Sequence, residues 1–409
     1  MAEDRNLSIA LVSSYEFTRE PGGVKDFILG LKKALQKNGC KVFVIAPGSR
    51  DAAKEGVVDY VLGMGFKLAT DQTEFMASFS RKKTARKILS EIKPDIIVIH
   101  EPLVPSIGHT IISSVVKSKN GGPIIIGQFH ASREDMNWPL KVAEFFARHL
   151  MRRPKFNRRT ILGLTSGYMT TINNNLDGRI AVSKATKKFW QKKLPADYEV
   201  IYNGIDTKEL SPEGSKINSW IKNDEKIILF AGRHDPRKGM EDLINGIEIL
   251  VSGGHDDLRL KIAGAGELTV YLKKIVERMN LHKYIEFVGV LPRAELVKAY
   301  RTVDLVVAPS ADGEGFNRTI IEARSCGTLV VCTKIGGQDE AIGKDLAPFM
   351  AKSKNPRSLA EQIMKVLSLP EIKKQEIRKN GIKNVKNRFD WDNIAREHIA
   401  YYKSLISKN

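Results

Sequence analysis

Residues 303–332 read VDLVVAPSADGEGFNRTIIEARSCGTLVVC, and this stretch decides the fold. The apolar runs at 305–309 and 329–332 are short and bounded by turn residues, which is typical of buried strands. Between them, residues 318–325 are expected to form a helix. A strand, a helix and a strand in this order indicate a parallel sheet covered by helices.

The same alternation extends towards the N-terminus of the chain. Helical spacing of apolar residues, as at 23–38 and 240–251, separates further short apolar runs. These runs predict strands at 7–13, 41–46, 96–100, 123–128, 180–183, 198–202, 226–231, 258–263 and 285–288. We therefore predict an α/β protein with two Rossmann-like, doubly wound domains.

The length of the chain, 409 residues, also favours two domains over one. A stretch at 203–220 contains Gly, Pro, Ser and Asp but little periodicity, which indicates a boundary. We place an N-terminal domain at 1–205 and a C-terminal domain at 206–385. The last segment, 389–407, is expected to be one amphipathic helix.

Composition narrows the class of protein. The formal net charge of +19 attracts polyanions such as nucleic acid, anionic lipid or phosphorylated small molecules. The three cysteines form no C-x-x-C pair, so we expect a reducing cytoplasm and neither a disulfide framework nor a structural zinc site. The first residues do not resemble a signal peptide, and no apolar run is long enough for a membrane-spanning helix.

Two glutamates, Glu314 and Glu322, flank the predicted start of the helix at 318–325. A ligand lying across this helix start could touch both, with backbone N–H groups directed at its phosphates. The carboxylate of Glu322 suits the vicinal hydroxyls of a ribose. The alternative is a capping Glu314 beside a solvated Glu322.

A basic loop, GRHDPRKG at 232–239, directly follows a predicted strand. Loops at the carboxyl ends of parallel strands are where such sheets bind ligands. Arg233 and Lys238 would suit a diphosphate there. The alternative is a pair of solvated surface cations.

Three further features follow strands in the sequence. Gly22 and Gly23 would let the backbone approach a ligand, or would form a plain tight turn. His130 is placed to face a cleft, although a lone histidine is more often structural. The same reservation applies to His100 and Glu101. No P-loop, H-E-x-x-H, G-x-S-x-G or complete dinucleotide fingerprint occurs in the sequence.

Taken together and in this order, these segments resemble the family 4 glycosyltransferases of GT-B fold. The matching segments are PGGV at 21–24, FHAS at 129–132, AVS at 181–183, YNGID at 202–206, AGRHDPRKGM at 231–240, IAGAGE at 262–267, FVGVLPRAEL at 287–296, EGFNRTIIE at 314–322 and TKIGGQDEAI at 333–342. Within the family, the N-terminal half looks most like the phosphatidylinositol mannosyltransferases, on SSYEFTREPGGVKDFILGL, HEPLVPS and GRIAVS.

The resemblance implies a retaining transfer of a hexose, mannose or glucose, from a nucleotide-diphosphate sugar, without a metal. The N-terminal domain would bind the acceptor, and a C-terminal helix within 386–409 would cross back onto it, with Phe389 and Trp391 packing structurally. The catalytic residues implied are His130, Arg233, Lys238 and Glu314. The residues implied to bind the nucleotide-sugar are Gly22, Gly23, Arg233, Lys238, Gly315, Phe316, Asn317, Arg318 and Glu322.

The chain departs from the family pattern at two places. Asn317 and Arg318 stand where small or apolar residues are common, and Arg318 could contact phosphate or sugar. Residues 291–293 read LPR, where an acid would suit guanine, so GDP- and UDP-sugars both remain candidate donors.

Basic clusters in the N-terminal half predict contact with an anionic membrane surface, against the alternative of a solvated helix face. The first cluster is Arg81, Lys82, Lys83, Arg86 and Lys87, and the second is Arg152, Arg153, Lys155, Arg158 and Arg159. We expect a peripheral enzyme at the cytoplasmic face of the cell membrane with a lipid acceptor. The alternatives are a glycosyltransferase with a soluble or polysaccharide acceptor, a nicotinamide-dependent oxidoreductase and, more remotely, a nucleic-acid-binding protein.

Overall fold

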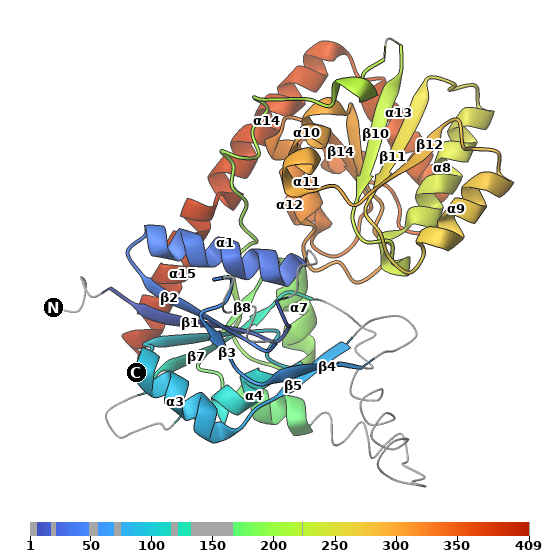
Figure 1. Ribbon diagram of the computed structural model, residues 1–409. Helices are drawn as coiled ribbons and strands as arrows, with labels where there is room; N and C mark the ends of the chain where they lie inside the picture. Colours follow the sequence, from blue (N-terminus) through green and yellow to red (C-terminus); the bar gives the residue numbers. More distant parts are fainter. Residues whose placement is uncertain are drawn as a thin grey trace, which may run out of the picture. The chain divides into compact units, whose positions relative to one another are not determined.

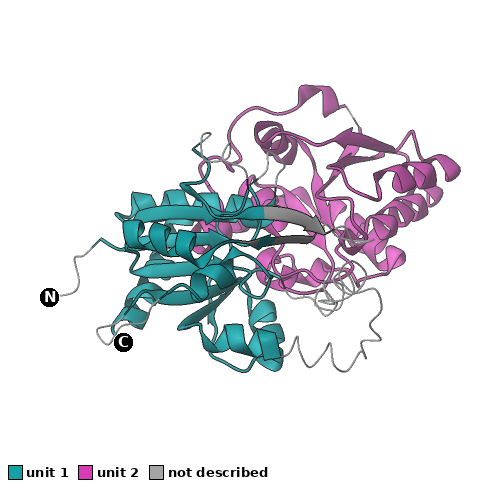
Figure 2. Ribbon diagram, turned by 60° about the horizontal axis from the view of Figure 1, so that its bottom comes forward, with its two compact units in different colours: residues 1–204, 391–409 teal, residues 205–390 magenta. Residues whose placement is uncertain are grey.

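The computed structural model describes residues 6–17, 22–48, 56–68, 75–115, 122–131, 167–222 and 224–408. The chain divides into two compact units (Figure 2). Unit 1 comprises Met1–Gly204 and Trp391–Asn409, and unit 2 comprises Ile205–Asp390. Each unit has helices around its own parallel sheet, so the predicted α/β fold with two Rossmann-like domains is confirmed (Figure 1). Within the described ranges, no helix is both long and apolar enough to cross a bilayer.

In unit 1 the described residues form a parallel sheet in the order β3-β2-β1-β6-β7-β8-β9. Its strands are β1 Ser8–Ser13, β2 Lys41–Ala46, β3 Tyr60–Val61, β6 Ile96–His100, β7 Ile124–Phe129, β8 Gly178–Ala181 and β9 Glu199–Val200. The helices of this unit are α1 Gly23–Lys37, α3 Lys82–Ile92, α4 Ile107–Ile112, α7 Lys184–Lys193 and α15 Trp391–Ile406.

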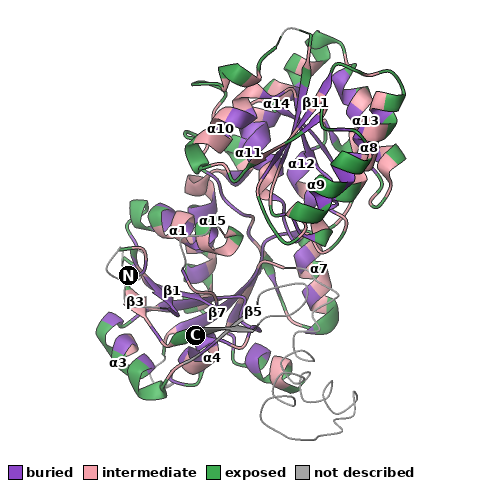
Figure 3. Ribbon diagram, turned by 45° about the vertical axis from the view of Figure 1, so that its right-hand side comes forward, coloured by how far each residue is buried: buried purple, intermediate pink, exposed green. Residues whose placement is uncertain are grey.

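Helices cover both faces of this sheet, which is why its strands are apolar almost without interruption. Alternate residues of β1 point to opposite faces. Ile9 and Leu11 join the core cluster under α1 and α15, whereas Ala10 and Val12 join the cluster under α3, α4 and α7. Figure 3 shows the result as buried strands between helices with exposed outer surfaces.

The C-terminal helix α15 packs against α1 through a close contact that two glycines permit. A Cβ atom at Gly30 or at Gly204 would lie 2.3 Å from the Trp391 ring. Any larger residue at either position would therefore push α15 away from the unit. Trp391 packs structurally in this contact.

One pair of strands in unit 1 departs from the predicted alternation. Strands β4 Met64–Leu68 and β5 Phe75–Phe79 pair antiparallel and lie outside the main sheet. The sequence analysis predicts neither of these strands, because a short apolar run does not reveal its partner strand.

In unit 2 the described residues form a parallel sheet in the order β12-β11-β10-β13-β14. Its strands are β10 Lys226–Ala231, β11 Leu258–Ala263, β12 Ile285–Gly289, β13 Leu305–Ala308 and β14 Leu329–Cys332. The helices of this unit are α8 Met240–Ser252, α9 Thr269–Arg278, α10 Arg293–Thr302, α11 Arg318–Ser325, α12 Gln338–Ile342, α13 Pro356–Leu367 and α14 Glu371–Phe389.

The strand order of each sheet reverses once, and this reversal marks the place for a ligand. In unit 2 the chain runs outward from β10 to β12 and then returns to β13 on the other side of β10. In unit 1 it runs from β1 to β3 and returns to β6 on the other side of β1. Loops diverge at such a switch point and leave a crevice beyond the carboxyl ends of the strands.

The amphipathic helix predicted at 389–407 is present as α15, which begins two residues later, at Trp391. Helix α14 ends at Phe389, Asp390 is extended, and α15 begins at Trp391. Two hydrogen bonds stabilise the chain between the helices. Ile205 donates its N–H to the Phe389 carbonyl at 2.8 Å, and Thr207 donates its hydroxyl to the Asp390 carboxylate. These partners lie far from residues 389–390 in the chain, so the sequence pattern did not reveal them.

Candidate active site

The loops after β10 and β13 meet at the switch point of unit 2. Asp235 caps the short 3-10 helix η2 Pro236–Lys238 by accepting the Arg237 N–H at 3.0 Å. Gly239 follows with φ of 64°, and a Cβ there would lie 2.0 Å from the Pro309 carbonyl oxygen. Only glycine fits such a left-handed, crowded position. The loop after β10 is thereby pressed against the loop after β13.

This contact brings Lys238 to Glu314. Lys238 Nζ lies 2.6 Å from Glu314 Oε2, and Ser310 Oγ donates to the same oxygen at 2.9 Å. Burial alone would raise the pKa of Glu314, but the Lys238 charge and the two hydrogen bonds outweigh burial and lower that pKa. Glu314 is therefore ionised, and Lys238 is not the solvated cation of the alternative interpretation.

The loop after β14 contacts the backbone of Glu314. Gly336 has φ of 57°, and a Cβ there would lie 1.8 Å from the Glu314 carbonyl oxygen. Gly337 donates its N–H to the same carbonyl at 3.1 Å. The GG pair of the 333–342 motif thus fixes the backbone of Glu314.

Glu322 is nearly buried, at 6% exposed, and both its oxygens are engaged. Oε1 accepts Arg293 Nη1 at 3.0 Å and Arg318 Nη2 at 3.2 Å, while Oε2 accepts the Tyr300 hydroxyl at 3.1 Å. Arg293 Nη2 also lies 3.0 Å from Glu209 Oε2. The alternative of a solvated Glu322 is therefore wrong.

Sequence reasoning had not connected Arg293 and Tyr300 with Glu322. Both lie on α10, and the sequence separations of 29 and 22 residues follow no helical spacing. A signal existed for Arg293, which stood out in the LPR segment. Tyr300 carries no comparable signal in the sequence.

Arg233 differs from the other cations of the loop because 65% of its side chain is exposed. Its Nη2 lies 3.2 Å from Asp235 Oδ2, and Arg237 Nη2 lies 2.7 Å from the same oxygen. Arg233 is thus a surface cation on a loop at the carboxyl end of the sheet, and only a weak exposed pair would have to be broken for it to bind a ligand.

The residues before α11 mainly hold the loop itself. Asn317 is the N-cap of α11: its Oδ1 accepts the Thr319 N–H at 3.2 Å, and its amide donates to Gln338 Oε1 at 3.2 Å. Phe316 packs on Phe389 with ring centroids 5.5 Å apart. Gly315 joins this loop to Glu314. Glu314 is therefore not the cap of this helix, contrary to the alternative interpretation.

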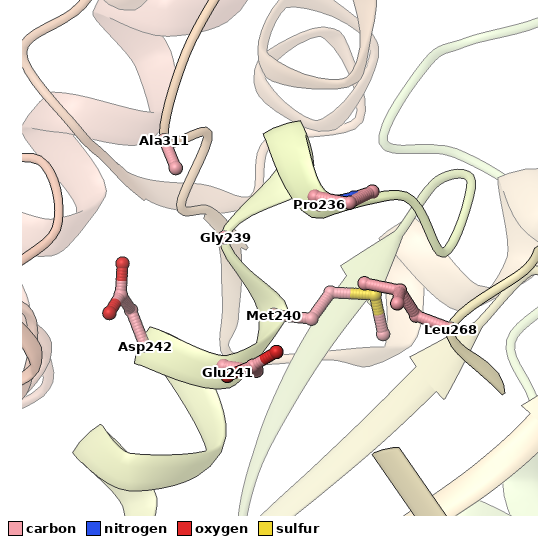
Figure 4. A pocket seen from close by; sticks show the side chains of 7 residues that line it. All are labelled: Pro236, Gly239, Met240, Glu241, Asp242, Leu268 and Ala311. Atoms are coloured by element: carbon pink, nitrogen blue, oxygen red, sulfur yellow. The ribbon is translucent and has the colours of Figure 1, made fainter. Parts of the chain in front are cut away.

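A pocket of about 200 Å³ lies beside this loop (Figure 4). Its lining residues are Pro236, Gly239, Met240, Glu241, Asp242, Leu268 and Ala311. Burial raises the pKa of Asp242 against the opposing charge of Lys354. Neither Lys238 nor Glu314 lines this pocket, so it is not the place where those two residues act.

In unit 1 the predicted site residues lie at the carboxyl ends of β6 and β7 and at the start of α1. Gly22 is the N-cap of α1, and a Cβ at Gly23 would meet no atom of the described residues within 4 Å. His130 Nε2 lies 3.0 Å from His100 Nδ1, and the His130 N–H donates to Glu101 Oε1 at 3.0 Å. Burial lowers the pKa of His130 to about 3.

The first basic cluster lies on α3. All five of its side chains, from Arg81 to Lys87, are exposed, while Ala85, Ile88 and Ile92 on the other face are buried in the core of unit 1. The apolar residues of α3 are therefore not free to enter a membrane. The second cluster, at 152–159, lies outside the described residues. Among the residues that are described, no group of His, Cys, Asp or Glu is arranged to hold a metal ion.

Two family models match the chain. The model of the glycosyl transferases group 1 matches residues 214–386, and that of Glycosyltransferase Family 4 matches residues 21–209. A phosphatidyl-myo-inositol mannosyltransferase of Mycobacterium tuberculosis is 25% identical over 98% of this chain and 97% of its own length. A D-inositol 3-phosphate glycosyltransferase of Segniliparus rotundus is 26% identical over 52% of this chain and 48% of its own.

The fold is shared with solved enzymes along its full length. HepE of Anabaena, solved in complex with UDP, superposes with a TM-score of 0.71 at 18% identity, over 97% of this chain and 100% of its own. The two family models cover both units, and the two sheets match the architecture predicted from the resemblance. This chain belongs to the family 4 glycosyltransferases of GT-B fold.

Proposed function

We propose that this glycosyltransferase transfers a hexose, mannose or glucose, from a nucleotide-diphosphate sugar to a membrane lipid of phosphatidylinositol or glycerolipid type, with retention of the anomeric configuration. The observation that carries the proposal is the meeting of Lys238, Glu314 and the Glu322 network at the switch point of unit 2. Such a crevice is the usual nucleotide site of doubly wound sheets.

The cations of the loop after β10 are assigned to the diphosphate. Charge builds on the diphosphate as the sugar departs, and fixed cations stabilise that charge without reorganising. Lys238 is already held by Glu314, so a bound phosphate would find its ammonium group in place. Arg233, which is exposed, would supply a second, adaptable contact.

Glu322 is assigned to the ribose hydroxyls, and Glu314 to the donor sugar. Arg293 and Arg318 hold Glu322 Oε1, which leaves acceptor capacity on Oε2 beside the Tyr300 hydroxyl. Fixed cations can stabilise the leaving group without a metal ion, so we expect the rate to be unchanged by EDTA.

Unit 1 is assigned to the acceptor, with His130 near the reacting groups and Gly22 and Gly23 leaving room for the donor. The exposed basic face of α3 supports an anionic membrane surface, and the mannosyltransferase relatives act on a phosphatidylinositol by name. We place the enzyme at the cytoplasmic face of the membrane. A soluble acceptor is the second candidate, and the inositol 3-phosphate relative supports it.

A ligand panel tests the donor first. Because a ligand stabilises the native state that binds it, GDP-mannose, UDP-glucose and ADP-glucose are compared by thermal shift with the free nucleotides. One donor should raise the unfolding temperature, and Glu322→Ala should remove that shift. No shift with any nucleotide sugar would refute the donor assignment.

The acceptor is tested with the donor that binds. Phosphatidylinositol vesicles and soluble inositol 3-phosphate are offered separately, and the products are analysed by mass spectrometry and by NMR of the anomeric proton. Transfer to the vesicles with the donor's anomeric configuration supports the proposal. Transfer to the soluble compound alone would replace the lipid acceptor, and inversion would overturn the retaining assignment.

A further inference from the structure

Three histidines gather on one face of the sheet of unit 1, next to α1 and α15. His100 and His398 are fully buried, whereas His130 is half-buried. The ring of Phe27 lies 5.7, 4.9 and 6.3 Å, centroid to centroid, from His100, His130 and His398 respectively. One aromatic side chain thus contacts all three imidazoles and shields them from water.

Two of these imidazoles form a hydrogen-bonded pair. His100 Nδ1 lies 3.0 Å from His130 Nε2, and the rings stack at 5.3 Å with an interplanar angle of 29°. Burial lowers the pKa of both histidines, and the pKa of His398 to about 3, so all three rings are neutral at pH 7. Between two neutral imidazoles, one nitrogen donates its proton and the other accepts.

The surroundings of His100 indicate the direction of this hydrogen bond. His100 Nε2 is buried without a partner among the described residues. If His100 accepted at Nδ1, its own proton would be on Nε2, as a buried N–H with no acceptor among the residues that the structure describes. Buried N–H groups without an acceptor are rarer than acceptors without a donor. His100 therefore donates from Nδ1, and His130 carries its proton on its own Nδ1.

The backbone of His130 is held from the same strand end. Glu101, directly after His100, accepts the His130 N–H at 3.0 Å and donates its own N–H to the Gln128 carbonyl at 2.8 Å. Glu101 is a non-glycine residue with φ of 56°, a strained conformation of the kind that gathers at functional sites. The end of β6 thus positions both the backbone and the ring of His130.

We propose that His100 is a positioning residue that fixes the tautomer of His130, so that His130 offers an Nδ1–H donor to an oxygen of the sugar or the acceptor. With Nε2 occupied by His100, His130 has no lone pair left with which to take a proton as a base. This inference rests on the proposed function for the role of His130, but the pairing itself can be tested without any substrate.

The substrate-free test is NMR of the full chain, with the histidine ring nitrogens labelled with ¹⁵N. His130→Gln identifies the His130 signals. We expect the proton of His130 on Nδ1 in the wild type across neutral pH. In His100→Leu, which removes the donor but fills a similar volume, we expect a mixture of tautomers. In His100→Asn, whose amide nitrogen can lie near the position of Nδ1, the wild-type tautomer should return.

The kinetic test uses the donor that the thermal panel identifies, with phosphatidylinositol vesicles as acceptor. His100→Leu should lower kcat by about 10- to 100-fold, the range known for the loss of a partner that orients a metal-bound histidine, with KM for the donor unchanged. His100→Asn should recover most of this loss. Unchanged unfolding temperature and donor affinity in both variants separate positioning from damage to the fold.

Two results would overturn the inference. One is a wild-type His130 with its proton on Nε2, and this result remains decisive even if His100→Leu does not fold. The other is a His100→Leu enzyme with wild-type kcat while His130→Gln is inactive. If His130→Gln itself keeps full activity, the proposed role of His130 in transfer fails, and the wild-type tautomer still decides the pairing.

Discussion

Replacing Lys238 by Met removes the ammonium group that lies 2.6 Å from Glu314 Oε2 but keeps most of the side chain. If Lys238 stabilises the leaving diphosphate, the loss should be about 2–4 kcal/mol of transition-state stabilisation. At 1.36 kcal/mol per factor of ten, this corresponds to about 30- to 1,000-fold in kcat/KM. The assay is initial-rate release of nucleoside diphosphate at several donor concentrations.

The same substitution also destabilises the protein, and this effect has to be separated from catalysis. Breaking a buried ion pair costs about 3–5 kcal/mol, because the remaining charge is left unpaired. The side chains here are 23% and 14% exposed, so we expect the lower end of that range. The control is Lys238→Met with Glu314→Gln, which removes both charges. Stability should largely return in this double variant, measured by urea denaturation, whereas activity should not.

The pH dependence of stability provides a second check on the pair. The pKa of Glu314 is lowered in the folded state, so its contribution is present above the unfolded pKa of a glutamate, about 4.3. That contribution is lost as the pH falls through the lowered folded value. The wild type should therefore lose its advantage over the double variant in acid. A Lys238→Met enzyme with wild-type kcat/KM would refute the diphosphate assignment outright.

Glu322→Ala should weaken the binding of the donor, measured by calorimetry. Glu322→Gln should have an intermediate affinity, because glutamine keeps the shape of the side chain but not its charge. Equal affinities in the wild type and both variants would remove Glu322 from the site. Gly239→Ala should destabilise unit 2 by at least about 1–3 kcal/mol, since φ is positive and the Pro309 carbonyl is 2.0 Å away. Gly254→Ala is its matched control, since φ there is also positive but the Cβ would meet no described atom within 4 Å. Neutralising the basic face of α3 should weaken sedimentation with anionic vesicles by about 1 kcal/mol per charge at low salt; unchanged sedimentation would argue for a soluble acceptor. The substituted residues are Arg81, Lys82, Lys83, Arg86 and Lys87.

Periodicity was sufficient for the central strands, such as β1, β6 and β13, because they are buried on both faces. A buried parallel strand has to be apolar almost throughout, so a short apolar run such as 305–309 is enough to locate it in the sequence. The hairpin β4–β5 and the break at Asp390 were not predictable in this way. The break depends on a partner far along the chain, Ile205 for Phe389, whereas each strand of the hairpin depends on its pairing with the other. A short apolar run encodes neither kind of partner.

In the candidate site, too, some residues could be predicted from the sequence and others could not. Four residues could be chosen from the sequence because they lie in loops that follow strands or in the first turns of the next helix, near the carboxyl edge of the sheet. They are Arg233, Lys238, Glu314 and Glu322. Their partners could not be chosen. Arg293 reaches Glu322 from the start of another helix, and only the packing of α10 beside α11 brings the two side chains within 3.0 Å.

The sequence by itself determined the class of this protein: most of its strands, its two Rossmann-like domains, and the charged residues of the loops at the carboxyl edge of the sheet of unit 2. Only the tertiary structure decided the state of the predicted site residues. Glu314 is ionised by Lys238, Asn317 is occupied as a helix cap, and His130 is held by His100. The physical reason is that position along a strand depends on local sequence, whereas charge, tautomer and hydrogen bonding depend on neighbours that folding brings within about 3 Å.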